Sequence, residues 1–345
     1  MTTWRLLHVV TAGYIAFGFS LGALVSQLFL NNLGGLDPLP RGLTPTGSGQ
    51  RAIDIRWRQR RERFIAENRY NQGKTNIADD LIQRVKILCF IVIAEDQVVA
   101  KRSVYQQTWG RRCDRLLLFS TSATDPDTII LKVPKAGHPV EDDSYASLQA
   151  LKYIYTHHLE EAHWFIRVHT MTFVVLENLR YFLKDEDYNK PIYFGQVLRE
   201  GNAVFPLGSA GYVISREAIS KFGAYSAPKT SCKGSTSSEC LVVAECFRHL
   251  GIILGDSRDA LDRSRFHGIS VESVSVHEYP AWFAELDVHH NMTKQGIKSV
   301  SDISITISPV SDSVILALEY FLYRARVYGA HLPMTSLNKI HRQLA

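Results

Sequence analysis

The chain has 345 residues, of which 46% are hydrophobic and 21% charged, and its net charge is +5. This composition excludes an intrinsically disordered chain, and the length exceeds that of one average domain. One segment carries a local charge of +4, from Arg51, Arg56, Arg58, Arg60, Arg61 and Arg63 against Asp54 and Glu62. Such a cluster could bind nucleic acid or acidic lipid, but we interpret it as a solvated stem near a membrane. Because the rest of the chain is close to neutral, we expect no nucleic-acid partner.

An uncharged apolar segment lies at residues 9–30, and its 22 residues include one strongly polar side chain, Gln27. As a helix it would reach about 33 Å, which is enough for a hydrocarbon core of about 30 Å. A cleaved signal peptide has a shorter apolar region, so we predict a single transmembrane signal anchor. The chain is thus expected to divide into a tail (1–8), the span (9–30), a basic and Gly/Pro-rich stem (31–78), a folded domain (79–330) and a C-terminal tail (331–345).

Hydrophobic periodicity predicts strands that alternate with helices. The expected strands are 85–94, 116–120, 164–168, 192–195, 211–215 and 252–254, the last one buried. The expected helices are 103–109, 142–158, 217–222, 239–250, 312–328 and a segment whose apolar positions are Phe173, Leu176, Leu179, Tyr181 and Phe182. This alternation predicts an α/β domain with a largely parallel sheet, where ligands bind beyond the carboxyl ends of the strands. The turn His169-Thr170-Met171 directly follows the strand at 164–168 and therefore occupies such a position.

Several separated blocks follow one another in a fixed order between residues 79 and 329. They are KILC at 86–89, Thr108-Trp109 with Arg112-Cys113, Trp164-Phe165, PIYFG at 191–195, GSAGYVIS at 208–215, GDSRD at 255–259, and Leu318-Glu319-Tyr320 with Tyr328-Gly329. Together these blocks resemble the core 1 β1,3-galactosyltransferase family (glycosyltransferase family 31), which includes a chaperone-like inactive paralogue. The resemblance implies a GT-A-like, Rossmann-like fold, type II topology with residues 1–8 cytoplasmic, and a Golgi or ER membrane location.

The activity implied by the resemblance is the inverting transfer of galactose from UDP-galactose to GalNAc on Ser/Thr, with Mn²⁺ at the donor diphosphate. The residues that match the family's nucleotide-sugar-binding region are Thr108, Trp109, Gly208, Gly211 and Asp256. A divalent metal neutralises the leaving diphosphate as a Lewis acid, and hard oxygen ligands hold it. A carboxylate must also take the proton from the acceptor hydroxyl.

The metal positions depart from the family pattern. Its three acids fall on His169, Thr170 and Met171, and its late metal-ligand histidine falls on Ser308. Histidine can ligate Mn²⁺, but a threonine hydroxyl is a weak neutral ligand and a thioether is too soft. We therefore expect a filled surface turn rather than a rebuilt metal site, and no cofactor in this protein.

The position of the catalytic base departs as well. The family's Glu-Asp pair corresponds to Glu239-Cys240. A thiol with an ordinary pKa is mostly protonated at pH 7 and is a poor general base. Glu239 remains, but an acidic residue at this position also compensates the positive end of a helix.

Three elements of one chemical site are thus substituted together, which favours a family member whose own catalysis is absent or strongly reduced, with a chaperone-like or glycan-binding role. The alternative is an active β1,3-galactosyltransferase with an atypical or metal-free site, and a third option is a copy without a retained function. The enzyme hypothesis would gain if Asp256, Asp259 or Asp302 reached the turn. The partners we expect are a membrane, GalNAc-bearing glycoproteins or an active paralogue, and a homo-oligomer is left open.

The chain contains five cysteines without the CxxC spacing of a zinc site. The resemblance implies the disulfides Cys89–Cys113 and Cys232–Cys246, which leaves Cys240 as the odd thiol. Two retained disulfides would indicate an oxidising lumen. The sequon at Asn291 predicts glycosylation only if this part of the chain is lumenal. His267 matches another histidine of the family, for which we expect a structural role.

Overall fold

The computed structural model describes residues 76–325, except 123–124, 133–138, 226–231, 233–237 and 288–290. The predicted span at 9–30, nearly all of the predicted stem and the C-terminal tail lie outside the described residues. Within the described part of the chain, no helix is both long and apolar enough to cross a membrane.

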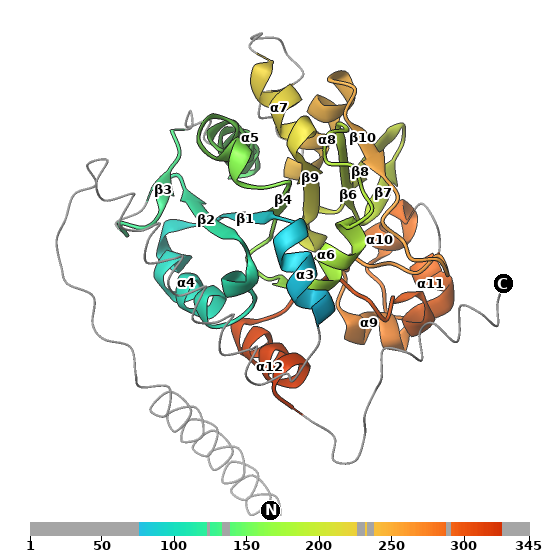
Figure 1. Cartoon of the computed structure of the whole chain (residues 1–345). Coiled ribbons are helices and arrows are strands. Elements are labelled where there is room, and N and C mark those ends of the chain that lie inside the picture. Colours follow the sequence, from blue (N-terminus) through green and yellow to red (C-terminus); the bar gives the residue numbers. More distant parts are fainter. Residues whose placement is uncertain are drawn as a thin grey trace, which may run out of the picture. The chain divides into compact units, whose positions relative to one another are not determined.

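A seven-stranded sheet with the strand order β10-β6-β9-β4-β1-β2-β3 forms the centre of the described domain (Figure 1). Its strands are β1 (Ile87–Val92), β2 (Arg115–Ser120), β3 (Ile129–Ile130), β4 (Trp164–Arg167), β6 (Ile192–Gly195), β9 (Tyr212–Ser215) and β10 (Ile253–Gly255). Strand β9 runs antiparallel to both β4 and β6, while the other neighbouring pairs are parallel. The predicted α/β domain with a mostly parallel sheet is therefore confirmed.

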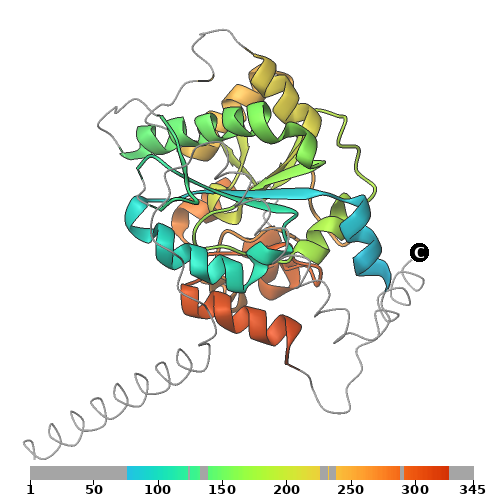
Figure 2. The ribbon, with the colours of Figure 1, turned by 60° about the vertical axis from the view of Figure 1, so that its left-hand side comes forward.

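Helices pack on both faces of this sheet (Figure 2). The described helices are α3 (Asn76–Arg84), α4 (Val98–Gln107), α5 (Pro139–His158), α6 (Leu176–Leu183), α7 (Arg216–Ala224), α8 (Glu239–His249), α9 (Val271–Val276), α10 (Ala281–Leu286), α11 (Asn291–Gln295) and α12 (Asp312–Tyr323). In β1, Leu88 and Phe90 belong to the core under α5 and α7. Ile87, Cys89 and Ile91 belong to the core that includes residues of α4, α6 and α12. This alternation explains why the strand is apolar throughout, since both of its faces are covered.

Two small antiparallel pairs complete the described strands and correct one expectation. They are β5 (Phe173–Val174) with β11 (Thr306–Ile307), and β7 (Val197–Glu200) with β8 (Ala203–Pro206). Phe173 is thus in a strand, and α6 begins only at Leu176. Because the partner strand of β5 lies far along the chain, the local sequence carries no signal for this pairing.

Other element bounds also differ from the expectation. The helix expected at 103–109 begins already at Val98 and ends at Gln107, and α12 ends at Tyr323 instead of continuing to 328. The strand expected to be buried at 252–254 is the edge strand β10, where Ile253 is 63% exposed. An edge strand has a neighbour on one side only, so its apolar side chains need not be covered.

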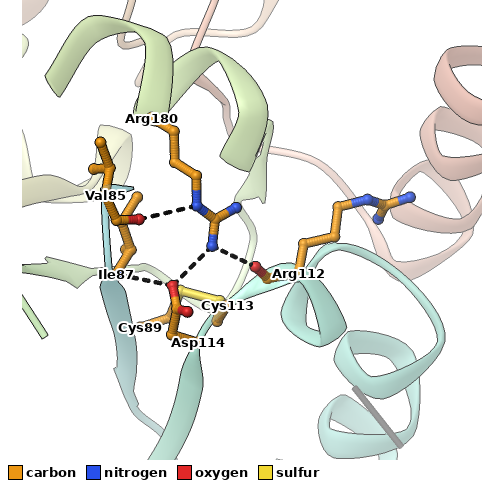
Figure 3. Close-up of a disulfide and its surroundings, with 7 residues drawn as sticks. All are labelled: Val85, Ile87, Cys89, Arg112, Cys113, Asp114 and Arg180. Atoms are coloured by element: carbon orange, nitrogen blue, oxygen red, sulfur yellow. Dashed lines mark hydrogen bonds and ion pairs between the residues drawn. A yellow bond between two sulfur atoms is a disulfide. The ribbon is translucent and has the colours of Figure 1, made fainter. Parts of the chain in front are cut away.

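The two expected disulfides, Cys89–Cys113 and Cys232–Cys246, are both present, and Cys240 is a free, buried thiol. Beside the first disulfide, Arg180 of α6 donates to the carbonyl oxygens of Val85 (3.2 Å) and Arg112 (2.9 Å) and to Asp114 (2.9 Å) (Figure 3). The same Asp114 oxygen accepts from the Ile87 N–H (2.8 Å). These contacts join α6, β1 and the short 3₁₀ helix η2 (Trp109–Arg112), away from the carboxyl end of β4.

Candidate functional site

The turn that follows β4 is closed by its own backbone and by one side chain. The Thr172 N–H donates to the His169 carbonyl oxygen (3.1 Å), and the Met171 N–H donates to His169 Nδ1 (3.3 Å). The Thr170 carbonyl oxygen accepts from the Tyr105 hydroxyl (2.8 Å). Met171 is 42% exposed. One histidine nitrogen is therefore occupied inside the turn, and the thioether faces solvent.

Ser308 lies beside this turn because β11 pairs with β5. The register matches Thr306 with Val174 and Ile307 with Phe173, and the Val310 N–H then donates to the Met171 carbonyl oxygen (2.8 Å). The Ser308 side chain is fully buried, and its Oγ has no hydrogen-bond partner among the described residues. The structure thus brings together the turn and the late position that the sequence assigned to the same site.

Glu239 and Cys240 reach the same region from the start of α8. Arg167, the last residue of β4, pairs with Glu239 (Nη2 to Oε2, 3.5 Å) and donates to the Gly208 carbonyl oxygen (3.1 Å). Glu239 also accepts from the Tyr212 hydroxyl (2.6 Å). Glu239 is therefore more than a helix-terminal charge, because it is a buried partner of an arginine and a tyrosine.

A short 3₁₀ helix, η4 (Gly208–Ala210), lies between β4 and α8. The Thr172 hydroxyl donates to the Ser209 carbonyl oxygen (2.9 Å), which fixes the turn against η4. Gly211 follows with φ +76°, and a Cβ there would lie 2.9 Å from the Arg167 carbonyl oxygen. Only glycine meets both demands without strain. Gly208 and Gly211, both predicted at the site, thus have a positioning role that the geometry explains.

Two cationic side chains, Arg167 and Lys101, act electrostatically on the turn. Burial, together with repulsion from Arg167 and Lys101, lowers the pKa of His169 to about 4, so this imidazole is neutral at physiological pH. Lys101 itself forms an ion pair with Asp312 at the start of α12. Burial, and next the neighbouring Glu239 carboxylate, raise the pKa of the Cys240 thiol. The thiol is therefore protonated at neutral pH.

The Mn²⁺ implied by the family resemblance does not fit these residues. Within the described part of the chain, no group of three or more His, Cys, Asp or Glu side chains could hold a metal ion. The turn offers a neutral imidazole with one nitrogen already bonded, a threonine hydroxyl and a thioether. A hard divalent cation prefers carboxylate oxygen ligands, and the cations nearby oppose its binding.

No protein-family model matches this chain. The chain is 29% identical over 263 residues to glycoprotein-N-acetylgalactosamine 3-beta-galactosyltransferase 1 of Xenopus laevis, a match that covers 74% of this chain and 71% of that protein. This similarity, which extends over most of both chains, confirms the predicted resemblance to the core 1 β1,3-galactosyltransferase family.

Two chondroitin sulfate synthases are also similar to part of this chain. It is 24% identical over 181 residues to chondroitin sulfate synthase 3 of Mus musculus and 25% identical over 179 residues to that of Homo sapiens. Each match covers 47% of this chain and 20% of the relative. Among solved structures, 4-diphosphocytidyl-2C-methyl-D-erythritol synthase from Anaerococcus prevotii aligns with a TM-score of 0.31 and 9% identity, covering 51% of this chain and 88% of that one.

The structure also locates the other residues that the family motifs indicated. The Thr108 hydroxyl donates to Val104 within α4, and Trp109 is buried against Tyr105, the residue that binds the turn. His267 is fully buried with Nε2 2.9 Å from Ser304 Oγ, which agrees with a structural role. Asn291 begins α11.

The three aspartates considered as replacement ligands pair with arginines. Asp256 pairs with Arg258, while Asp259 and Asp302 both pair with Arg263. Asp256 follows β10, a different strand from the one that carries the turn. The ion pairs described for these three carboxylates are therefore with arginines at positions 258 and 263.

Sequence reasoning missed Arg167, Tyr212 and Lys101 as members of this region. Arg167 carried a usable signal, because it is a charged residue in an otherwise apolar strand and a buried charge requires a partner. Lys101 carried none, since its approach to the turn depends on how α4 and α12 pack.

Proposed function

We propose that this core 1 family member has a GT-A-type fold and that its own galactosyl transfer is absent or strongly reduced. It would act as a chaperone-like or glycan-binding paralogue. The observation that carries the proposal is the turn after β4, where a neutral His169, Thr170 and an exposed Met171 lie close to Lys101 and Arg167. The mostly parallel sheet with one antiparallel strand, β9, supports the GT-A assignment.

The chemistry of the family explains why these substitutions matter together. Metal-assisted departure of a diphosphate contributes several kcal/mol to transition-state stabilisation. A general base contributes a further factor of roughly 10²–10⁴. Here the turn cannot hold the metal, and the Cys240 thiol cannot take the proton. Glu239 is engaged by Arg167 and Tyr212, which leaves it poorly suited to replace the base.

The location and partners follow from the same proposal. Residues 9–30 would anchor the chain in the Golgi or ER membrane as a single-pass type II protein. The two disulfides support a domain that folds in an oxidising lumen. The partners would be GalNAc-bearing glycoproteins or an active paralogue of the same family.

A second candidate is an active transferase that works without a metal. It is favoured by Lys101 and Arg167, because two cations close to the turn could neutralise a leaving diphosphate in place of Mn²⁺. Both cations already pair with carboxylates, Asp312 and Glu239, which weighs against this function.

The test is UDP-galactose transfer to a GalNAc-peptide by the purified full chain, with Mn²⁺ and with EDTA. An active family member assayed in parallel serves as the positive control. We expect transfer at the background rate in both conditions. Robust Mn²⁺-dependent turnover would overturn the proposal, and turnover that persists in EDTA would establish the second candidate. Co-purification of an active paralogue at native expression would support the chaperone-like role.

A further inference from the structure

A hollow opens at the carboxyl ends of β6 and β10, on the same edge of the sheet as the turn after β4. The hollow is shallow and open to solvent, so a ligand would lie largely at its mouth and reach inward with one polar group. β6 and β4 flank β9, so strand spacing places the two sites roughly 10 Å apart along this edge.

Asp287 is the residue that sets this hollow apart. It lines the hollow and is only 6% exposed, and its Oδ2 has no hydrogen-bond partner among the described residues. Its backbone is fixed at the end of α10, where its N–H donates to Phe283 (2.9 Å), and by a bridge to Leu198 of β7. A buried carboxylate oxygen without a donor is costly, and a ligand that donates to this carboxylate would recover that cost.

The other polar groups of the hollow are mainly acceptors. Ser257 and Ser264 donate their hydroxyl protons to the carbonyl oxygens of Gly195 and Phe266, so their oxygens keep lone pairs for a ligand. At the rim, Arg258 pairs with both Asp256 and Asp262 and supplies a guanidinium donor. A site with many acceptors and one planar cation suits a ligand that carries several hydroxyl groups.

Two other ligand classes suit the hollow less well. The described residues contain no group of acidic, histidine or cysteine side chains that could hold a metal ion, which disfavours a divalent cation. A basic side chain would meet Asp287 but would also approach the Arg258 guanidinium. A neutral hydroxyl avoids this repulsion and still donates to the carboxylate.

We infer that this hollow binds one neutral sugar residue, with a sugar hydroxyl donating to the Asp287 carboxylate and the rim formed by Asp256 and Arg258. The inference rests on the glycan-binding part of the proposed function and gives it a location. It assigns the main polar contact to Asp287, which lies outside the sequence blocks that carry the family resemblance.

The experiment measures binding of methyl glycosides of N-acetylgalactosamine, galactose and glucose to the full chain in mild detergent, by saturation-transfer difference NMR. We expect at least one glycoside to bind, and Asp287→Asn to raise its dissociation constant by up to about tenfold, because a hydrogen bond to a charged acceptor becomes a weaker one to a neutral amide oxygen. Asp302→Asn is the matched control, since Asp302 is exposed, pairs with Arg263 and does not line the hollow. This control should bind as the wild type does.

Asp256→Asn provides a second variant in case Asp287→Asn fails to fold, because the Asp256 side chain lies at the exposed rim. It should weaken binding severalfold. Methylguanidinium, a small cation, is tested alongside the glycosides as a probe for simple charge attraction. The inference is overturned if none of the glycosides binds or if Asp287→Asn binds unchanged. It is also overturned if only methylguanidinium binds and salt abolishes that binding. The transferase assay is independent of this result: turnover would overturn the proposed inactivity and leave the sugar site standing.

Discussion

Two clusters of ionisable side chains in this domain differ in how their members are paired. The scaffold cluster consists of Arg112, Arg180, Asp114 and Glu319, and the β4-edge cluster consists of Arg167, Glu239, Cys240 and His169. In the scaffold cluster, Glu319 accepts two bonds of 2.7 Å from Arg112, and Arg180 contacts Asp114 at 2.9 Å. At the β4 edge, Arg167 and Glu239 are 3.5 Å apart, beside a neutral imidazole and a protonated thiol.

The difference shows what folding requires and what chemistry requires. Charges that hold helices to the sheet find their partners within the chain, and the attraction between the partners offsets the cost of burying them. A group of acids that awaits a metal repels itself until the metal arrives, and it contributes nothing to folding alone. The side chains at the β4 edge do not repel one another in this way, so the domain can fold without a metal there.

The largest expected effect comes from rebuilding the β4 edge. We expect His169→Asp, Thr170→Asp, Met171→Asp and Ser308→His together to create Mn²⁺ binding, because they restore hard oxygen ligands and a histidine. Adding Cys240→Asp to this variant should raise galactosyl transfer by roughly 10²–10⁴-fold, the usual contribution of a general base. The measurements are calorimetric Mn²⁺ titration and the transferase assay. The variant with Cys240→Asp alone is the control. Comparable activity in this control would contradict the proposal that the metal turn, the late histidine position and the base position must all be restored.

Breaking the scaffold cluster should have the next largest effect. Glu319→Gln keeps the shape of the side chain but leaves the buried Arg112 charge without its main partner. We expect a loss of about 3–5 kcal/mol in the free energy of unfolding. The matched control is Glu245→Gln on α8, which breaks an exposed pair with Arg248 and should cost less than about 1 kcal/mol. Urea unfolding followed by circular dichroism checks both, and equal losses would remove the distinction between the two kinds of pair.

The sequence predicted the scaffold better than it predicted the site. The strand at 192–195 matches β6 to the residue, and both disulfides are as expected. These features follow from local periodicity and from an ordered set of motifs. By contrast, β5 pairs with β11 through contacts distant in sequence, and no local pattern announces Phe173 as a strand residue.

The site shows the same limit. The positions of His169, Cys240 and Ser308 could be read from motifs, but their common location at the end of β4 required the structure. Asp287 carried no signal at all, because its burial depends on the packing of α10 against β7 and on the end of β10.

Acid should destabilise the fold through its buried histidines, and His267, which lies outside both clusters, gives the clearest test. Burial lowers the pKa of His267 to about 4, whereas in the unfolded chain it titrates near 6.5. Its contribution to stability is therefore complete above pH 6.5 and is lost as the pH falls toward 4, by about 3 kcal/mol. His267→Gln should flatten this acid limb in urea unfolding between pH 7 and pH 4. His249→Gln, at the exposed end of α8, is the control, and an unchanged acid limb in His267→Gln would contradict the assignment.

The smallest effect is expected at Cys240. Because the thiol is buried and protonated, Cys240→Ser should change the free energy of unfolding by no more than about 2 kcal/mol and leave galactosyl transfer at background. Thiol titration gives a direct check: unfolded chains kept without reductant should show one reactive thiol, from Cys240. Three reactive thiols would mean that one of the disulfides is absent in the protein.

The two ends of the central sheet have a bearing on how this protein behaves in a crowded compartment. The outermost strands, β3 and β10, have two and three residues. Each end therefore presents only a few unpaired backbone groups, even though Ile130 and Ile253 are exposed there. A strand this short is a poor template for the strand of another chain. The sheet can thus expose apolar side chains at its borders with little tendency to aggregate edge to edge.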